Sequence, residues 1–118
     1  MSLLTHIDNY CERLSPEFWA EPLNALSNAS FFIAALLLHQ TYKKQGLHKL
    51  PITIMIYLVA IIGIGSGLFH TFANQLTMLA DIIPIMTFVL TYLFFALRYL
   101  LEFSKTKSAA AIILLLLA

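Results

Sequence analysis

The chain has 118 residues, of which 60% are hydrophobic and only 11% are charged. Soluble globular domains carry about 25% charged residues, so this composition predicts a membrane protein. The net charge of +1 gives no electrostatic basis for binding nucleic acid, and no phosphate-cradling loop or basic-aromatic stripe is present. A single cysteine, Cys11, excludes a disulfide within the chain.

The first 22 residues form a mixed, acidic segment that we expect at the membrane surface. Tyr10, Phe18 and Trp19 suit the level of the lipid headgroups. The segment lacks the basic start of a cleaved signal peptide, so we do not expect one. Pro22 is suited to open the first helix, because the N–H that it lacks would be unpaired at that position.

Long apolar stretches then predict an all-α integral membrane protein, a helical bundle with three complete transmembrane helices and the start of a fourth. At 1.5 Å per residue, about 20 residues cross a hydrocarbon core of about 30 Å. The predicted helices cover residues 23–41, 51–72, 76–97 and 108–118, and the last of these is too short to cross. We therefore expect residues 1–118 to be a single transmembrane domain at the N-terminal end of a longer multi-helix protein.

Basic residues predict the orientation of these helices. They lie after the first and the third predicted helix: Lys43, Lys44, Lys49, Arg98, Lys105 and Lys107. By the positive-inside rule both regions are expected on the cytoplasmic side, which leaves the N-terminus extracytoplasmic. Ser27 and Asn28, His70, and Asp81 then all lie toward the outer leaflet.

The most informative residues are His70 and Asp81, because both sit in otherwise apolar stretches at membrane depth. Burying such a group in lipid costs about 2.5–3.5 kcal/mol on insertion scales, so it indicates a functional site. Ser66 precedes His70 by four residues and shares its helical face. One interpretation is a zinc site with His70 as ligand and Asp81 and Ser66 beside it. The other is a structural polar cluster that holds two helices together.

Three glycines, Gly63, Gly65 and Gly67, precede His70. No strand precedes them, so they do not indicate nucleotide binding. Gly63 and Gly67 instead predict a small-xxx-small face for close helix packing.

Oxygen-bearing side chains are frequent in the N-terminal segment: Asp8, Asn9, Glu12, Glu17 and Glu21. Calcium binds 6–8 oxygen ligands, so part of this set is a candidate calcium site. The alternative is a solvated acidic arm.

Four stretches of the sequence resemble the alkaline ceramidase family. They are Tyr10-Cys11-Glu12, residues 19–28 (WAEPLNALSN), residues 63–70 (GIGSGLFH) and residues 81–84 (DIIP). The family belongs to a superfamily of seven-helix membrane hydrolases that includes adiponectin-receptor-like proteins. The resemblance covers roughly residues 8–98. The form of residues 20–28 is similar to the bacterial branch, which implies a bacterial inner membrane.

The resemblance implies a zinc-dependent lipid amidase that cleaves ceramide or a related lipid amide to a fatty acid and an amine. In the family three histidines hold the zinc, and a serine and an aspartate lie beside it. His70, Ser66 and Asp81 match these positions. Asp81 would orient the water and move its proton, and Ser66 would stabilise the oxyanion. The other two zinc histidines belong to a His-x-x-x-His motif on the family's last helix, and no such motif occurs in these 118 residues.

The resemblance also implies a calcium site near the N-terminus. Glu12 and Glu21 match the family's glutamates and Cys11 its cysteine. Asn9 and Tyr10 stand where the family has aspartate and tryptophan, and Asp8, one residue earlier, could compensate through a local shift.

A second function remains open at this point: a non-catalytic, receptor-like membrane module whose Ser66, His70 and Asp81 are structural or sense a ligand. A downstream His-x-x-x-His would favour the enzyme. The expected partners are membrane lipids, including the lipid amide.

Overall fold

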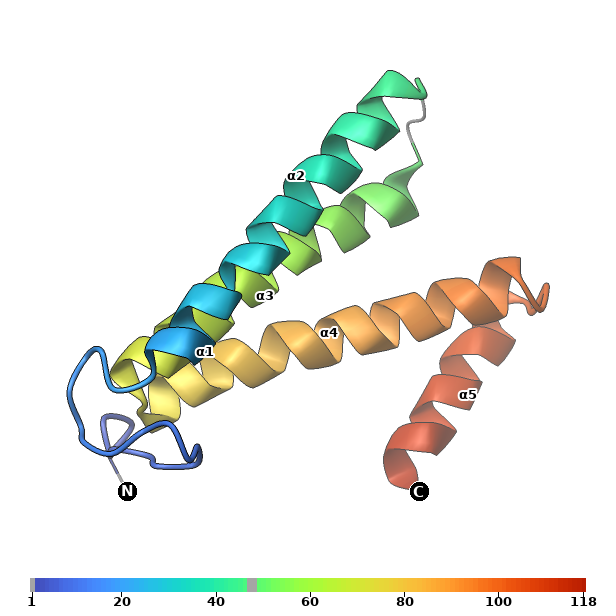
Figure 1. Ribbon diagram of the computed structural model, residues 1–118. Coiled ribbons are helices and arrows are strands. Elements are labelled where there is room, and N and C mark those ends of the chain that lie inside the picture. Colours follow the sequence, from blue (N-terminus) through green and yellow to red (C-terminus); the bar gives the residue numbers. More distant parts are fainter. Residues whose placement is uncertain (1, 47–48) are drawn as a thin grey trace.

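The computed structural model describes residues 2–46 and 49–118, which form helices and no β-strand (Figure 1). In chain order the helices are α1 (Pro22–Ser27), α2 (Ala29–Lys44), α3 (Leu50–Phe72), α4 (Gln75–Tyr99) and α5 (Lys105–Leu117). Asn28, between α1 and α2, keeps a right-handed helical conformation. The two helices therefore form one nearly continuous stretch.

Three helical stretches are long and apolar enough to cross a membrane: Pro22–Lys44, Leu50–Phe72 and Gln75–Tyr99. At 1.5 Å per residue the 23 residues of α3 span about 35 Å, enough for a hydrocarbon core of about 30 Å. The predicted all-α membrane fold is confirmed, and the chain is a multi-pass membrane protein.

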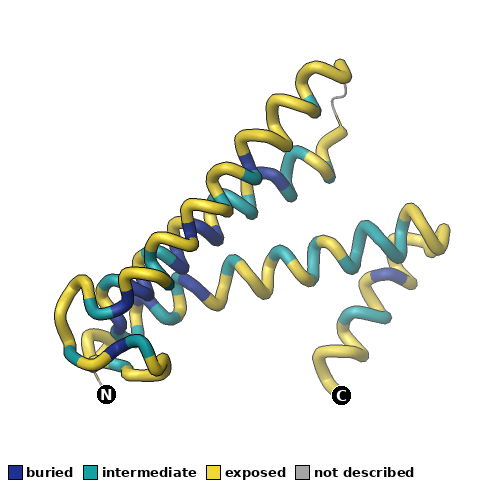
Figure 2. The backbone as a smooth tube through the Cα atoms, viewed as in Figure 1, coloured by how far each residue is buried: buried dark blue, intermediate teal, exposed yellow. Residues whose placement is uncertain are grey.

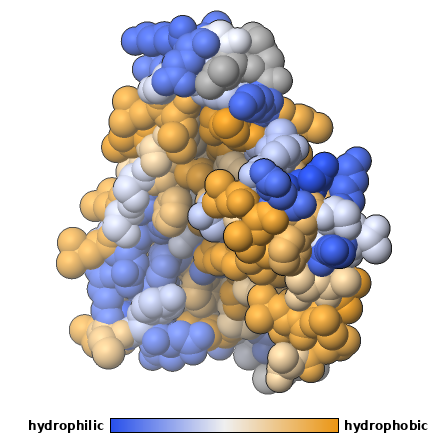
Figure 3. All heavy atoms as spheres, turned by 90° about the vertical axis from the view of Figure 1, so that its right-hand side faces the viewer, coloured by the Kyte–Doolittle hydropathy of each residue, from blue (hydrophilic) through white to orange (hydrophobic). Residues whose placement is uncertain are grey.

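The distribution of side chains is that of a protein whose solvent is lipid. Large apolar residues such as Leu36, Leu37 and Ile64 are exposed, whereas Arg13, Glu21 and other polar residues are buried. Figure 2 shows buried residues gathered where the N-terminal arm meets α3 and α4, and Figure 3 shows wide apolar surfaces between polar patches. Most of the buried polar groups therefore lie at this end of the molecule.

Several helix ends differ by one to three residues from the sequence prediction, and the starts of α5 and α4 do so for identifiable reasons. α5 begins at Lys105 rather than Ser108, because the side chain of Ser104 accepts a hydrogen bond from the Lys107 amide and caps the helix. The turn before α4 is centred on Ala73, which adopts a left-handed conformation with φ of +42°. Asn74 and Thr77 then form a reciprocal capping box, so Gln75 already belongs to α4.

α3 and α4 approach each other closely at Gly65. A Cβ atom at Gly65 would lie 2.0 Å from the carbonyl oxygen of Ala80 and 3.3 Å from the Cα of Asp81. Pro84 explains why this carbonyl faces a neighbouring helix, since proline has no N–H to bond the carbonyl four residues earlier. Ser66 follows Gly65 and Asp81 follows Ala80, so both residues lie at this helix crossing.

The two glycines of the predicted packing face, Gly63 and Gly67, differ in their surroundings. A Cβ at Gly63 would meet Phe31 and Phe32 of α2 at 2.9 and 3.2 Å, so Gly63 is a packing residue. A Cβ at Gly67 would meet no such atom within 4 Å. Among the described residues no contact supports the prediction for Gly67, because α4 crosses α3 on the side of Gly65.

The N-terminal arm (residues 2–21) lies across the turn between α3 and α4 (Figure 1). The Ile7 amide donates to the carbonyl of Ala73 at 2.7 Å, and the Leu76 amide donates to the carbonyl of Leu3 at 2.9 Å. His6 and Asn74 form an isolated antiparallel bridge. The arm thus covers the end of the helices at which the polar residues are buried.

Gly65→Ala is expected to destabilise the protein by about 1–3 kcal/mol, the usual cost of overpacking. The added methyl group would collide with the Ala80 carbonyl and push α3 away from α4. Gly67→Ala is the matched control, because it adds the same group to the same helix in open space. Thermal unfolding of both variants in detergent checks this expectation. An unfolding temperature of Gly65→Ala equal to that of Gly67→Ala would contradict it.

Candidate functional site

The candidate site lies at the end of α3 and the start of α4. Ser66 and His70 occupy successive turns of α3, and Asp81 lies on α4 beside Gly65. All three side chains are buried. The structure therefore places the three residues that the sequence singled out at membrane depth on two adjacent helices, at the same end of the molecule.

The carboxylate of Glu21, at the start of α1, binds His70. Nδ1 of His70 lies 2.6 Å from Oε2 of Glu21, and the Asn24 side chain donates to the same oxygen at 3.2 Å. The ring of Tyr10 packs edge-on against the imidazole, with 4.8 Å between the ring centroids. These contacts fix both the position and the rotation of the His70 ring.

Arg13 completes this cluster and was not recognised in the sequence. Its Nε donates to Oε1 of Glu21 at 2.5 Å, and its side chain is fully buried. One terminal nitrogen donates to the carbonyl of His70 at 3.0 Å. That carbonyl lies in the last turn of α3, where the helix offers no amide partner and a positive charge is favourable. The sequence offered one signal for this role: Arg13 is a lone arginine in an otherwise acidic arm.

The protonation of Glu21 follows from its surroundings. Burial raises the pKa of its carboxyl, but hydrogen bonds from His70, Arg13 and Asn24 outweigh this effect and hold the pKa below its ordinary value. An ionised carboxylate only accepts, so Nδ1 of His70 is the donor. A neutral ring in this tautomer carries its lone pair on Nε2. A carboxylate on the opposite nitrogen is the usual arrangement of a metal-binding histidine.

Asp81 lacks the partners that such a residue normally has. Its Oδ1 is buried and accepts no hydrogen bond from the described residues. Buried carboxylate oxygens are nearly always paired, so an unpaired one in a membrane span indicates a candidate functional residue. Together, the free Asp81 oxygen and the oriented His70 ring fit part of a zinc site.

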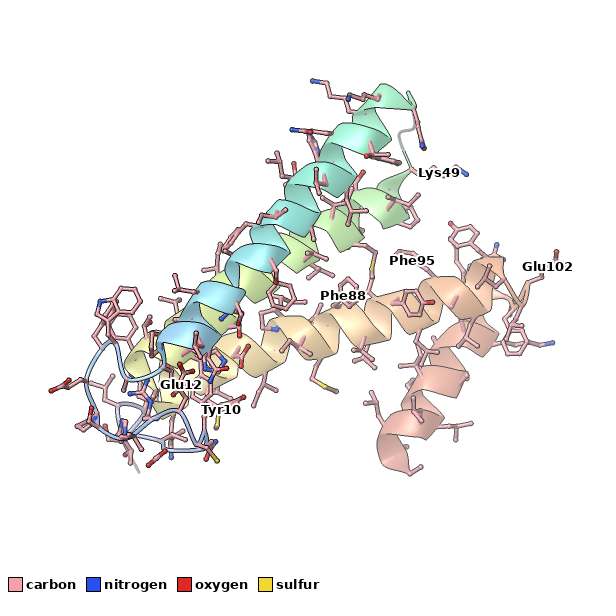
Figure 4. All side chains as sticks on the ribbon, viewed as in Figure 1. Tyr10, Glu12, Lys49, Phe88, Phe95 and Glu102 are labelled. Atoms are coloured by element: carbon pink, nitrogen blue, oxygen red, sulfur yellow. The ribbon has the colours of Figure 1, made fainter. Side chains whose placement is uncertain are left out.

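The two glutamates of the candidate calcium site are already bound by other groups of the protein. Both oxygens of Glu12 accept backbone amides at the start of α1, from Leu23 at 2.6 Å and from Asn24 at 3.0 Å. Glu21 is occupied by Arg13 and His70, while Asp8, Asn9 and Cys11 are exposed. Figure 4 shows Tyr10 and Glu12 near the beginning of α1. These contacts do not fit a calcium site.

Within residues 2–46 and 49–118 no three histidine, cysteine, aspartate or glutamate side chains are grouped closely enough to hold a metal. A catalytic zinc needs about three protein ligands. A zinc site that used His70 would therefore need further ligands from outside the described residues.

Comparison with known proteins identifies the family. The family model described as Ceramidase matches residues 5–118, nearly the whole chain. The chain belongs to the ceramidase family. Neither the curated proteins nor the solved structures contain a significant match. Membership indicates a ceramide-hydrolysing role and a membrane-lipid substrate, and it favours the hydrolase over the receptor-like alternative.

Glu21→Gln is expected to destabilise this protein by about 3–5 kcal/mol, because it removes the charge opposite the buried Arg13. Glu17→Gln is the matched control, since Glu17 is an exposed glutamate of the same arm. Denaturant unfolding of both variants in detergent measures the difference. Equal stability of the two variants would show that the buried ion pair does not hold the arm.

Proposed function

We propose that this protein provides His70, Asp81 and Ser66 to a zinc-dependent amidase that cleaves ceramide or a related lipid amide within the bilayer. Two observations support the proposal: His70 is oriented by Glu21, and the adjacent helix carries a buried, unpaired oxygen of Asp81. Family membership supports hydrolysis of ceramide. Perturbed, desolvated groups of this kind concentrate at functional sites.

His70 would hold the zinc through Nε2, with the remaining ligands supplied by a His-x-x-x-His outside these 118 residues. When bound, zinc acts as a Lewis acid that polarises the amide and lowers the pKa of the hydrolytic water toward neutrality. Glu21 would keep Nδ1 protonated and the ring aligned, as carboxylates behind metal-binding histidines do.

Asp81 is the proposed acid-base residue. Its unpaired oxygen would accept a proton from the water that attacks the amide carbon. It would return that proton to the nitrogen as the C–N bond breaks, so that a fatty acid and a free amine leave. Ser66, four residues before His70 on α3, would donate a hydrogen bond to the oxyanion.

In this proposal the acyl chain of the substrate lies between α3 and α4. The two helices diverge from their contact at Gly65, and a cavity of about 800 Å³ lies between them. It is lined by apolar and aromatic side chains such as Met55, Val59 and Phe88, and Figure 4 shows Phe88 and Phe95 on the side of α4 that faces α3. Val59 precedes His70 by eleven residues, about 16 Å of helix. A long chain would extend from the polar cluster into this cavity.

The orientation of the protein belongs to the same proposal. The lysines at the end of α2 and the start of α5, together with Arg98 at the end of α4, lie at the helix ends away from the N-terminal arm. The positive-inside rule favours these ends as cytoplasmic, with the N-terminus and the site extracytoplasmic in a bacterial inner membrane.

His70→Ala in the full-length protein is expected to abolish zinc binding, and Asp81→Asn to keep zinc and lose turnover. The reason is that His70 is a proposed ligand, whereas Asp81 is proposed to move protons. Loss of general acid-base catalysis costs about 10²–10⁴-fold in rate. Zinc per chain by elemental analysis and hydrolysis of ceramide check both variants. Full activity of Asp81→Asn would remove the role given to Asp81.

Val59→Trp is expected to raise KM for long-chain ceramides and leave short-chain analogues unaffected, because the indole would fill the cavity beyond the first part of the chain. Ile61→Trp is the matched control, since Ile61 is exposed on α3 and does not line the cavity. Hydrolysis of a series of acyl chain lengths gives the comparison. An equal effect on all lengths would place the chain elsewhere.

A further inference from the structure

Arg13 belongs to the N-terminal arm, yet its guanidinium is buried and donates hydrogen bonds to four oxygen atoms. Besides Oε1 of Glu21 and the carbonyl of His70, its guanidinium donates to the carbonyl of Ser15 at 3.2 Å and of Glu17 at 3.1 Å. Arg13 is 3% exposed. One cation thus joins the arm, the start of α1 and the end of α3.

This set of acceptors is the kind that binds calcium. Calcium takes carboxylate and backbone carbonyl oxygens, and here one carboxylate and three carbonyls converge on a single positive charge. Glu12 and Glu21 match the glutamates of the family's calcium site, yet Glu12 caps α1 and Glu21 faces Arg13. A calcium ion beside Glu21 would compete with a guanidinium already bound there.

We infer that Arg13 is a built-in replacement for the calcium ion, so that the arm of this protein is held against the His70-bearing end of α3 without bound calcium. The planar guanidinium provides up to five donors in a fixed fork, which suits acceptors on three separate segments. The cation is covalently part of the chain, so the contact cannot be lost when calcium is low.

The inference concerns the arm alone and holds whether or not the proposed zinc chemistry is correct. Its readouts are calcium binding and thermal unfolding, neither of which requires turnover. Failure of the calcium test would leave the proposed hydrolysis standing, and loss of activity in other variants would leave this inference standing.

The test uses the full-length protein, freed of calcium by a selective chelator in detergent. We expect the wild type to show no saturable binding of radioactive calcium. Its unfolding temperature should be the same with millimolar calcium as with millimolar magnesium or the chelator. Saturable binding that stabilises the wild type and disappears in Glu21→Gln would overturn the inference.

The Arg13→Ser variant tests the same claim by removing the cation. We expect its unfolding temperature to fall by about 10 °C or more, because the buried Glu21 loses its counter-charge. Calcium, unlike magnesium, should restore part of this loss, since the freed oxygens can then bind it. Arg98→Ser is the matched control, because Arg98 donates to the exposed carbonyl of Phe103 at the opposite end of α4. Equal unfolding temperatures of the two variants would also overturn the inference. Should Arg13→Ser fail to fold, the wild-type measurement decides alone.

Discussion

The arrangement of the site depends on the carboxylate of Glu21, which binds the guanidinium of Arg13 with one oxygen and the imidazole of His70 with the other. An isolated buried charge would be costly, but here each charged group has a partner and further hydrogen bonds. The same carboxylate fixes the tautomer of His70. The carboxylate that docks the N-terminal arm is therefore the same group that orients His70.

A second constraint brings Asp81 to the same place. Pro84 leaves the carbonyl of Ala80 without its helical partner, and Gly65 leaves room for that carbonyl against α3. Both features are local, yet together they set the crossing of two long helices. The result is a carboxylate with a free oxygen on α4 and, on the adjacent α3, a histidine whose ring is held by Glu21. Preorganisation of this kind is what hydrolytic chemistry in a dry site requires.

The sequence predicted the membrane helices well, because long apolar stretches have few alternatives to spanning a bilayer. It also singled out His70 and Asp81, since ionisable residues are costly in lipid. It did not predict the partner of Glu21: the carboxylate was assigned to calcium, and its contact with His70 joins residues 49 positions apart. Arg13 was missed because its burial depends on how the arm folds back, which no local pattern records.

The central claim is that the arm orients His70 through Arg13 and Glu21 so that its Nε2 can bind a metal beside Asp81. The most direct test is a structure of the full-length, zinc-loaded protein with anomalous scattering measured at the zinc edge. We predict a zinc peak at Nε2 of His70, next to Asp81, with Nδ1 on Glu21 and the Arg13 guanidinium in its present place. A zinc peak remote from His70, or a cation between Glu12 and Glu21 with Arg13 displaced, would contradict the account.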